Sequence, residues 1–251
     1  MGKAKDIEVK PISSKDANKI IKRLHYSGKV VPNSKIHFGV FLNGECGGAL
    51  QFGPSMRKDL IAPLVKGTGW NEFIELNRMA LADWLPRNGE SRAISLSMKL
   101  LKKNYPWLKW VVSFADATQC GDGTIYRASN FVLTGIKRNT QLRMDPETGQ
   151  PIQSMAAFHK GKAREFKNWD KLSGYQLRYI YFLHPKEKEN LTVPILPFNK
   201  IDQIGAGMYR GEKVTYKERN QAAEAGDGPD QGHSGGSTPT QPLQNNEVNN
   251  E

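Results

Sequence analysis

Residues 73–116 constrain the fold most, because they change from a strand pattern to a helix pattern and back again. In "FIELNRMAL" the side chains alternate, and this alternation places Arg78 on the same face as Ile74 and Leu76. "SRAISLSMKLLKKNYP" carries apolar residues at helical spacing and ends at Pro106. "WVVSFAD" is typical of a short buried strand. We therefore expect a strand, a helix and a second strand, with the loop "ADWLPRNGES" before the helix.

Shorter patterns lie on both sides of this segment. "DANKIIKRLHYSG" predicts a helix that begins after Ser13 or Ser14 and ends at Gly28. In "HFGVFLNGECGGALQFG" two strands are expected to meet at Asn43-Gly44, a strong hairpin signal. Further on, "GTIYRASNF" predicts a short helix and "VLTGIKR" another strand. No internal repeat is evident.

Charge is distributed unevenly along the chain. Residues 218–251 contain six acidic residues, one basic residue and no aromatic residue, so we expect an acidic, polar, disordered tail there. Residues 1–217, the expected folded domain, then carry 35 Lys and Arg against 19 Asp and Glu, a net charge of +16. This balance is typical of a protein that binds a polyanion such as nucleic acid. Lysines that serve only solubility are the alternative.

Cysteine spacing and hydropathy limit the location of the protein. Cys46 and Cys120 lie far apart and lack the spacing of metal ligands, which indicates free thiols in a reducing compartment. No apolar run approaches the roughly 20 residues that span a bilayer. The charged start "MGKAKDIEVK" does not resemble a signal peptide. We therefore expect a cytoplasmic protein without a membrane anchor.

The loop before the central helix is a candidate anion site. Backbone N–H groups and the positive end of a helix dipole attract phosphate groups. The candidate cofactor-binding residues are Arg87, Asn88, Gly89, Ser91 and Arg92. The loop is neither a Walker loop nor a Rossmann fingerprint, and an ordinary helix cap is the alternative explanation for Ser91.

The blocks "LHYSGK", "NRMAL", "PRNGESR", "WVVSFAD" and "GTIYRASN", taken in order, resemble the Mom family of phage DNA-modification proteins. That family is in turn similar to GNAT acyltransferases. The resemblance runs from Ile20 to Tyr209 and implies an α/β fold in which a mixed sheet with flanking helices holds acetyl-CoA or a related coenzyme A thioester. It also implies carbamoylmethylation of adenine in double-stranded DNA, which protects phage DNA from restriction, and a bound iron ion.

The same resemblance implies that the catalytic residues are His25, Tyr26, Asp116 and Tyr126, and that His25, Tyr26 and Asp116 bind iron. An imidazole, a carboxylate and phenols form a plausible ligand set for iron. Asp116 also ends a buried strand, at the edge where open α/β sheets bind ligands. An acid–base relay without metal, in which Tyr126 gives a proton to a thiolate, is the alternative.

Glu75 lies on the strand where GNAT-like enzymes often place a general base. A simple salt bridge explains this residue equally well, so Glu75 is not among the candidates.

Basic and aromatic residues of the C-terminal half are candidates for contacts with DNA. The candidate backbone-contacting residues are Lys160, Lys162, Arg164 and Lys167. In "GYQLRYIYF" tyrosines share one face of an expected strand, and either stacking on nucleobases or packing in a sheet explains them.

Three functions stay open. The leading one is an enzyme that modifies adenine in DNA. The second is a GNAT-type acyltransferase that acts on a protein or small-molecule amine, and the third is a basic protein that masks DNA without catalysis. Both a monomer and a homodimer are compatible with the sequence.

Overall fold

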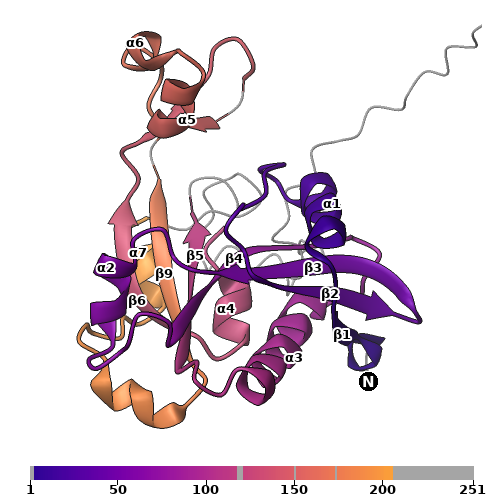
Figure 1. Ribbon diagram of the computed structural model, residues 1–251. Helices are drawn as coiled ribbons and strands as arrows, with labels where there is room; N and C mark the ends of the chain where they lie inside the picture. Colours follow the sequence, from indigo (N-terminus) through magenta and orange to yellow (C-terminus); the bar gives the residue numbers. More distant parts are fainter. Residues whose placement is uncertain (1–2, 118–120, 150, 173, 206–251) are drawn as a thin grey trace, which may run out of the picture.

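A seven-stranded mixed sheet forms the centre of the computed structural model, which describes residues 3–117, 121–149, 151–172 and 174–205 (Figure 1). The strand order is β1-β2-β3-β4-β5-β9-β6. Within it β4 and β5 pair in parallel and the other neighbours pair antiparallel. The strands are β1 (Glu8–Pro11), β2 (Ile36–Leu42), β3 (Glu45–Gly53), β4 (Phe73–Leu81), β5 (Trp110–Asp116), β6 (Val132–Arg138) and β9 (Tyr175–Phe182). The expected mixed α/β sheet is thus confirmed.

The described residues form seven helices, some of which cover the two faces of this sheet. They are α1 (Ser14–Leu24), α2 (Lys58–Ile61), α3 (Gly89–Asn104), α4 (Thr124–Ala128), α5 (Ser154–His159), α6 (Ala163–Phe166) and α7 (Asn199–Gln203), with 3-10 turns at Lys3–Asp6, Ala62–Leu64 and Pro185–Asn190. On one face α3 and α4 pack in the main core with Leu76 and Val111. On the other face α1 packs against Ala49 and Ala80, and α2 packs against the Phe73 and Trp110 rings. No helix in the described part of the chain is long and apolar enough to span a membrane.

The local signals around α1 and the first hairpin act as expected. Ser13, and not Ser14, is the N-cap, because its hydroxyl accepts the Asp16 N–H at 3.1 Å. The helix ends at Leu24, four positions before the predicted Gly28, and His25 is already extended at φ −78° and ψ 134°. Asn43 and Gly44 both have positive φ, as a two-residue hairpin turn requires.

A β-bulge in β4 overturns part of the predicted alternation. Gln51 of β3 lies opposite Arg78 and the next residue, Phe52, lies opposite Leu76, so Asn77 is an additional residue. Beyond Leu76 the alternation is therefore inverted, and the prediction that Arg78 shares the face of Leu76 is wrong. Ala80, two positions after Arg78, packs against α1 on the opposite face. The pattern of polar and apolar residues in "FIELNRMAL" does not indicate a bulge.

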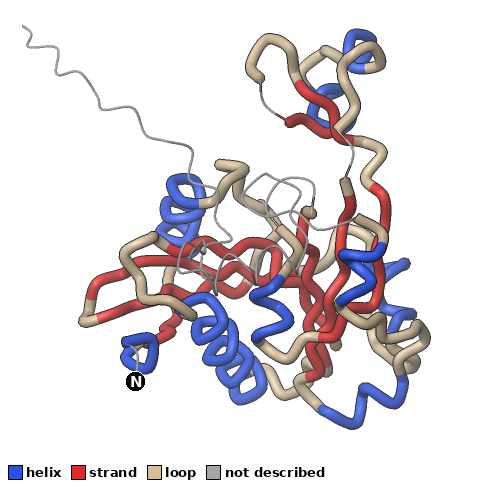
Figure 2. Tube along the Cα trace, turned by 180° about the vertical axis from the view of Figure 1, so that it is seen from behind, coloured by secondary structure: helices blue, strands red, loops and turns tan. Residues whose placement is uncertain are grey.

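A small insert, residues 139–172, separates β6 from β9 and was not expected from the sequence. It contains a two-stranded sheet, β7 (Leu142–Met144) and β8 (Pro151–Gln153), together with α5 and α6. Its own core consists of Ile152, Ala157, Phe166 and Trp169. Figures 1 and 2 show this insert projecting away from the main sheet. The predicted tail, residues 218–251, and its boundary at residue 217 lie outside the described residues.

Candidate functional site

The site lies where β4 and β5 separate. These strands pair only through Phe73–Glu75 and Trp110–Val112, although β4 continues to Leu81 and β5 to Asp116. The Phe73 and Trp110 rings are register partners and stack with centroids 4.6 Å apart, which holds the paired end together. Beyond this end β4 stays with β3 and β5 stays with β9, so a gap opens inside the sheet.

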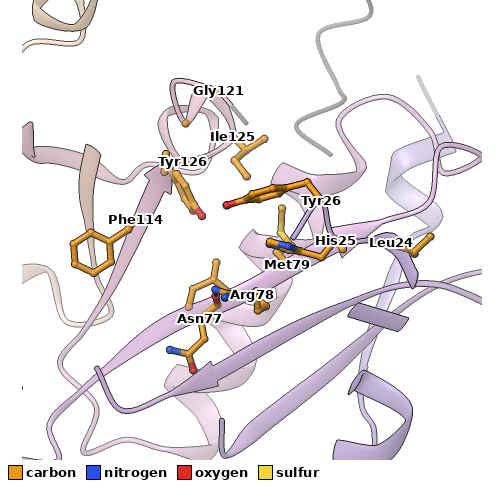
Figure 3. A pocket seen from close by; sticks show the side chains of 14 residues that line it. Leu24, His25, Tyr26, Asn77, Arg78, Met79, Phe114, Gly121, Ile125 and Tyr126 are labelled. Carbon is orange, nitrogen blue, oxygen red and sulfur yellow. The ribbon is translucent and has the colours of Figure 1, made fainter. Parts of the chain in front are cut away.

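Side chains from four segments line a pocket at this gap (Figure 3). They are Leu24, His25, Tyr26, Leu76, Asn77, Arg78, Met79, Ala80, Phe114, Ala115, Gly121, Gly123, Ile125 and Tyr126. The hydroxyl ends of Tyr26 and Tyr126 point toward one another in Figure 3. The structure thus brings together three of the four predicted catalytic residues, His25, Tyr26 and Tyr126.

Ser113 fixes the position of Tyr126. Its buried hydroxyl lies 3.3 Å from the Leu76 carbonyl oxygen, at the point where the β4–β5 pairing stops. The same hydroxyl oxygen lies 2.8 Å from the phenol oxygen of Tyr126, within hydrogen-bond distance. Gly123, just before α4, has φ +76°, and a Cβ there would lie 2.6 Å from the Tyr179 ring. This glycine lets α4 start close enough to β9 for Tyr126 to reach Ser113.

His25 is a neutral hydrogen-bond donor at this site. Its Nδ1 accepts the Ser27 N–H at 3.1 Å and lies 2.8 Å from the Ser27 hydroxyl oxygen. Nδ1 therefore carries a lone pair, and the single proton of the neutral ring is on Nε2. Burial, and then the positive charge of Arg78, lower the pKa of His25 to about 3. The ring stays neutral at physiological pH and presents Nε2–H as a donor.

Arg78 supplies the positive charge of the pocket. The bulge at Asn77 directs it to the face of α1, where its Nε donates to the Lys29 carbonyl oxygen at 3.2 Å. Its Nη1 donates to the Asn77 carbonyl oxygen at 2.7 Å. Two backbone acceptors thus fix a guanidinium beside His25, where it can stabilise negative charge on a bound group.

Asp116 is not among the described residues that line the pocket. Alternation along β5 places it with Val112 and Phe114, which pack on the α2 side, whereas Ser113 and Ala115 face the side of Tyr126. The structure therefore does not bring Asp116 into this pocket with His25, Tyr26 and Tyr126.

The described residues, as placed, do not fit the iron site that the resemblance implies. A neutral histidine that binds a metal through Nε2 needs its proton on Nδ1, and metal-bound histidines donate that N–H to an acceptor. Here Nδ1 instead accepts a backbone N–H, and a guanidinium stands beside the ring. Within the described residues, no group of three or more His, Cys, Asp or Glu could hold a metal ion. We therefore assign no step to iron.

The predicted cofactor loop forms the start of α3. Asn88 has φ +65° and makes no side-chain cap, while the Ser91 hydroxyl donates to the Asn88 carbonyl oxygen at 3.1 Å. Gly89 is buried against Ile7, and Arg92 donates to the Lys5 carbonyl oxygen at 3.4 Å. Arg87 is exposed. None of these five described residues lines the pocket. They could bind a cofactor only if it is long enough to reach from the pocket to the start of α3.

Glu75 does not form the exposed salt bridge considered from the sequence. The side chain is half-buried, and Ser55 and Asn77 hydrogen-bond to it. Burial raises the pKa of the Glu75 carboxyl, while these hydrogen bonds and the charge of Arg78 oppose the rise. Glu72 instead pairs with Lys109 at 2.6 Å.

Two candidate DNA-contacting groups take different positions. Tyr179 is fully buried in the main core, so this tyrosine packs in the sheet and does not stack on bases. In the insert Lys160, Arg164 and Lys167 are exposed, whereas Lys162 pairs with Glu147 and stands over the Trp169 ring.

Sequence reasoning missed Arg78 and Ser113. Ser113 leaves a recognisable signal, since it is the polar residue inside the apolar run "WVVSFAD". Arg78 leaves none, because its orientation depends on the bulge at Asn77.

The divided sheet and the polar pocket within it define an α/β protein whose site lies between two separating parallel strands. The sequence profile of the Mom protein family matches residues 6–200, and the chain belongs to this family. It is 36% identical over 198 residues to the methylcarbamoylase mom of Escherichia phage Mu. The aligned region covers 76% of this chain and 82% of that protein.

Two solved structures also show similarity to this chain. The ribosomal-protein-S18-alanine N-acetyltransferase of Escherichia coli is 11% identical, with a TM-score of 0.42 over 70% of this chain and 94% of that chain. An N-acetyltransferase from Staphylococcus aureus Mu50 is also 11% identical, with a TM-score of 0.41 over 70% and 97% of the two chains.

The low pKa of His25 predicts a loss of stability in acid. As the pH falls through about 6.5, the unfolded chain takes up a proton at this residue, while the folded chain does so only near pH 3. Between pH 7 and pH 5 this difference lowers the free energy of unfolding by about 2 kcal/mol. Urea unfolding of the wild type and of His25→Gln at both pH values measures it. The variant should lose about 2 kcal/mol less than the wild type, and an equal loss in both would contradict the neutral state of His25.

Proposed function

We propose that this protein modifies adenine in double-stranded DNA, by carbamoylmethylation of the exocyclic amine with a coenzyme A-type donor. The observation that carries the proposal is the pocket between β4 and β5, where His25, Arg78 and Tyr126 surround one space. The net charge of +16 on residues 1–217 supports a polyanionic substrate. The relative in phage Mu is named a methylcarbamoylase, which supports the same chemistry.

The gap in the sheet suits the extended arm of a coenzyme A thioester. Past Glu75, the edge of β4 that faces β5 has no strand partner among the described residues. An extended ligand with amide groups can bind such an edge through main-chain hydrogen bonds, as an added strand does. When bound, the coenzyme would supply a two-carbon unit activated as a thioester. Arg87 and the start of α3 would then contact its phosphate groups.

The pocket residues have distinct roles in this proposal. The Nε2–H of His25 donates to a carbonyl oxygen in the pocket, and the Arg78 guanidinium stabilises the negative charge that develops there. Tyr126, held by Ser113, gives its proton to a leaving thiolate. Attack of an amine on a thioester carbonyl alone yields an amide. In the carbamoylmethyl product the adenine amine is bonded to a methylene carbon and the carbonyl carbon to an amide nitrogen, so the roles given to these residues cover only activation of the thioester and departure of the thiolate.

The alternatives from the sequence are less well supported. A protein or small-molecule amine as the acceptor leaves the charge of +16 without a role. A protein that only masks DNA leaves a buried tyrosine, a neutral histidine and a fixed arginine around one pocket without a role.

Mass spectrometry of nucleosides from host DNA tests this function. Expression of the wild type should produce a modified adenine that is absent with an empty vector. His25→Ala and Tyr126→Phe should each lower its amount on the order of 10²-fold, because each loses a hydrogen-bond or proton donor at the reacting atoms. The matched controls His184→Ala and Tyr105→Phe alter residues outside the pocket and should keep full activity. Absence of any modified nucleoside with the folded wild type would refute the function.

Arg87 tests the coenzyme separately from the reaction. It is exposed at the start of α3, so Arg87→Ala should leave the fold unchanged. Loss of one charged contact to a phosphate should weaken coenzyme A binding roughly tenfold. Isothermal titration calorimetry measures this, with Lys103→Ala at the other end of α3 as the control. Equal affinities of the wild type and Arg87→Ala would remove this residue from the coenzyme site.

A further inference from the structure

The insert leaves the sheet at the same end as the pocket. The last residue of β5, Asp116, pairs with Gln176, and Gln176 pairs with Lys137 near the end of β6. Both connections to the insert therefore begin level with the end of β5, whose Phe114 and Ala115 line the pocket. Neighbouring strands lie about 5 Å apart, so the two connections to the insert begin within one or two strand widths of β5. Figures 1 and 2 show it rising beyond this end of the sheet.

Internal contacts hold the insert in a defined shape. Arg143 donates to the Trp169 carbonyl oxygen, and its guanidinium stacks over the Phe166 ring at 5.3 Å. The Lys162 ammonium pairs with Glu147, and the backbone N–H of Lys162 donates to the Ala157 carbonyl oxygen at 2.9 Å. Because Ala157 is fully buried in the insert core, the next residue of α5 is presented on a fixed support.

That next residue, Phe158, is an aromatic side chain that the fold does not bury. It is 64% exposed, and His159 packs edge-on against it with ring centroids 5.8 Å apart. Exposed cations stand nearby in sequence, at Lys160, Arg164 and Lys167. An exposed ring on an element that also carries exposed cations matches the chemistry of duplex DNA, which offers stacked bases between two rows of phosphates.

A target adenine must leave the helix to reach a pocket inside a protein sheet. Enzymes that act on a base extrude it, at a cost of a few kcal/mol for unstacking and unpairing. An apolar side chain that enters the base stack offsets part of this cost, and such side chains occur in proteins that open or kink DNA.

We propose that the insert is the element that grips the duplex beside the target adenine, and that Phe158 enters the base stack where that adenine leaves it. Lys160, Arg164 and Lys167 contact the phosphates on either side, while Lys162 supports the insert from within. This proposal rests on the proposed DNA modification and names the residues that bring the substrate to that site.

Fluorescence anisotropy with a labelled DNA duplex separates the two roles within the insert. Phe158→Ala should bind roughly tenfold more weakly at every salt concentration, with the salt dependence unchanged, because stacking but no charge is lost. The triple variant Lys160→Gln, Arg164→Gln, Lys167→Gln should lower the slope of log K against log salt by about 0.9 for each lost phosphate contact.

Two matched controls are available on other surfaces. Trp70→Ala removes an aromatic ring that is 62% exposed on the side of α2, and should leave binding unchanged. Lys99→Gln, Lys102→Gln, Lys103→Gln removes three exposed charges near the end of α3, just before β5 begins, and should leave the slope near that of the wild type. If the insert variants and their controls behaved alike, the proposal would be overturned.

A second measurement tests the entry of Phe158 into the stack. The probe is a duplex in which 2-aminopurine replaces an adenine whose modification has been located by mass spectrometry of oligonucleotide fragments. Saturating wild type should raise its fluorescence as the base unstacks, whereas saturating Phe158→Ala should raise it much less, and Phe158→Trp should restore the rise. If 2-aminopurine fluorescence rose equally with Phe158→Ala, the entry of Phe158 into the base stack would be overturned. The proposed modification of adenine by the wild type would not be affected by that result. Absence of modified adenine with the wild type would instead refute the proposed function.

Discussion

β4 and β5 pair only from Phe73 to Glu75, and every feature of the site depends on their separation after that point. The stacked rings of Phe73 and Trp110 close one end. At the other end, where the ladder to β5 has stopped, the Ser113 hydroxyl lies 3.3 Å from the Leu76 carbonyl oxygen. The same hydroxyl oxygen lies 2.8 Å from the Tyr126 phenol oxygen, so the residue next to the open strand also positions the phenol.

The bulge at Asn77 gives the pocket its electrostatic character. By inverting the alternation of β4, it places Arg78 on the side of α1, where the helix has just ended and His25 is extended. Burial and the neighbouring guanidinium keep the imidazole neutral, and the Ser27 N–H fixes which ring nitrogen carries the proton. The fixed cation, the neutral donor and the Tyr26 phenol beside it lie across the pocket from the Tyr126 phenol, and these groups favour a bound group that develops negative charge.

The sequence was sufficient for elements whose signals are local. The Ser13 cap, the Asn43-Gly44 turn and the apolar stripe of α3 each depend on a few neighbouring residues, and the structure has them all. The bulge at Asn77 depends on pairing with β3, which no window of the sequence contains, so the orientation of Arg78 was predicted wrongly. The insert was missed for a similar reason, since its short elements are stabilised by a core formed between distant residues such as Ile152 and Trp169. His25, Tyr26 and Tyr126 were found through family blocks, and their meeting in one pocket is a consequence of the strand separation.

The central claim is that the separation of β4 and β5 positions Tyr126 for the reaction, and Ser113→Ala tests it most directly. Ser97→Ala is the matched control, because Ser97 is equally buried but donates to the Ala93 carbonyl oxygen within α3. Both variants should lose about 1 kcal/mol of unfolding free energy. Nucleoside mass spectrometry should show modified adenine reduced by roughly tenfold with Ser113→Ala, since about one hydrogen bond's free energy is lost at the phenol. It should show wild-type levels with Ser97→Ala. Wild-type levels of modified adenine with folded Ser113→Ala would contradict the account.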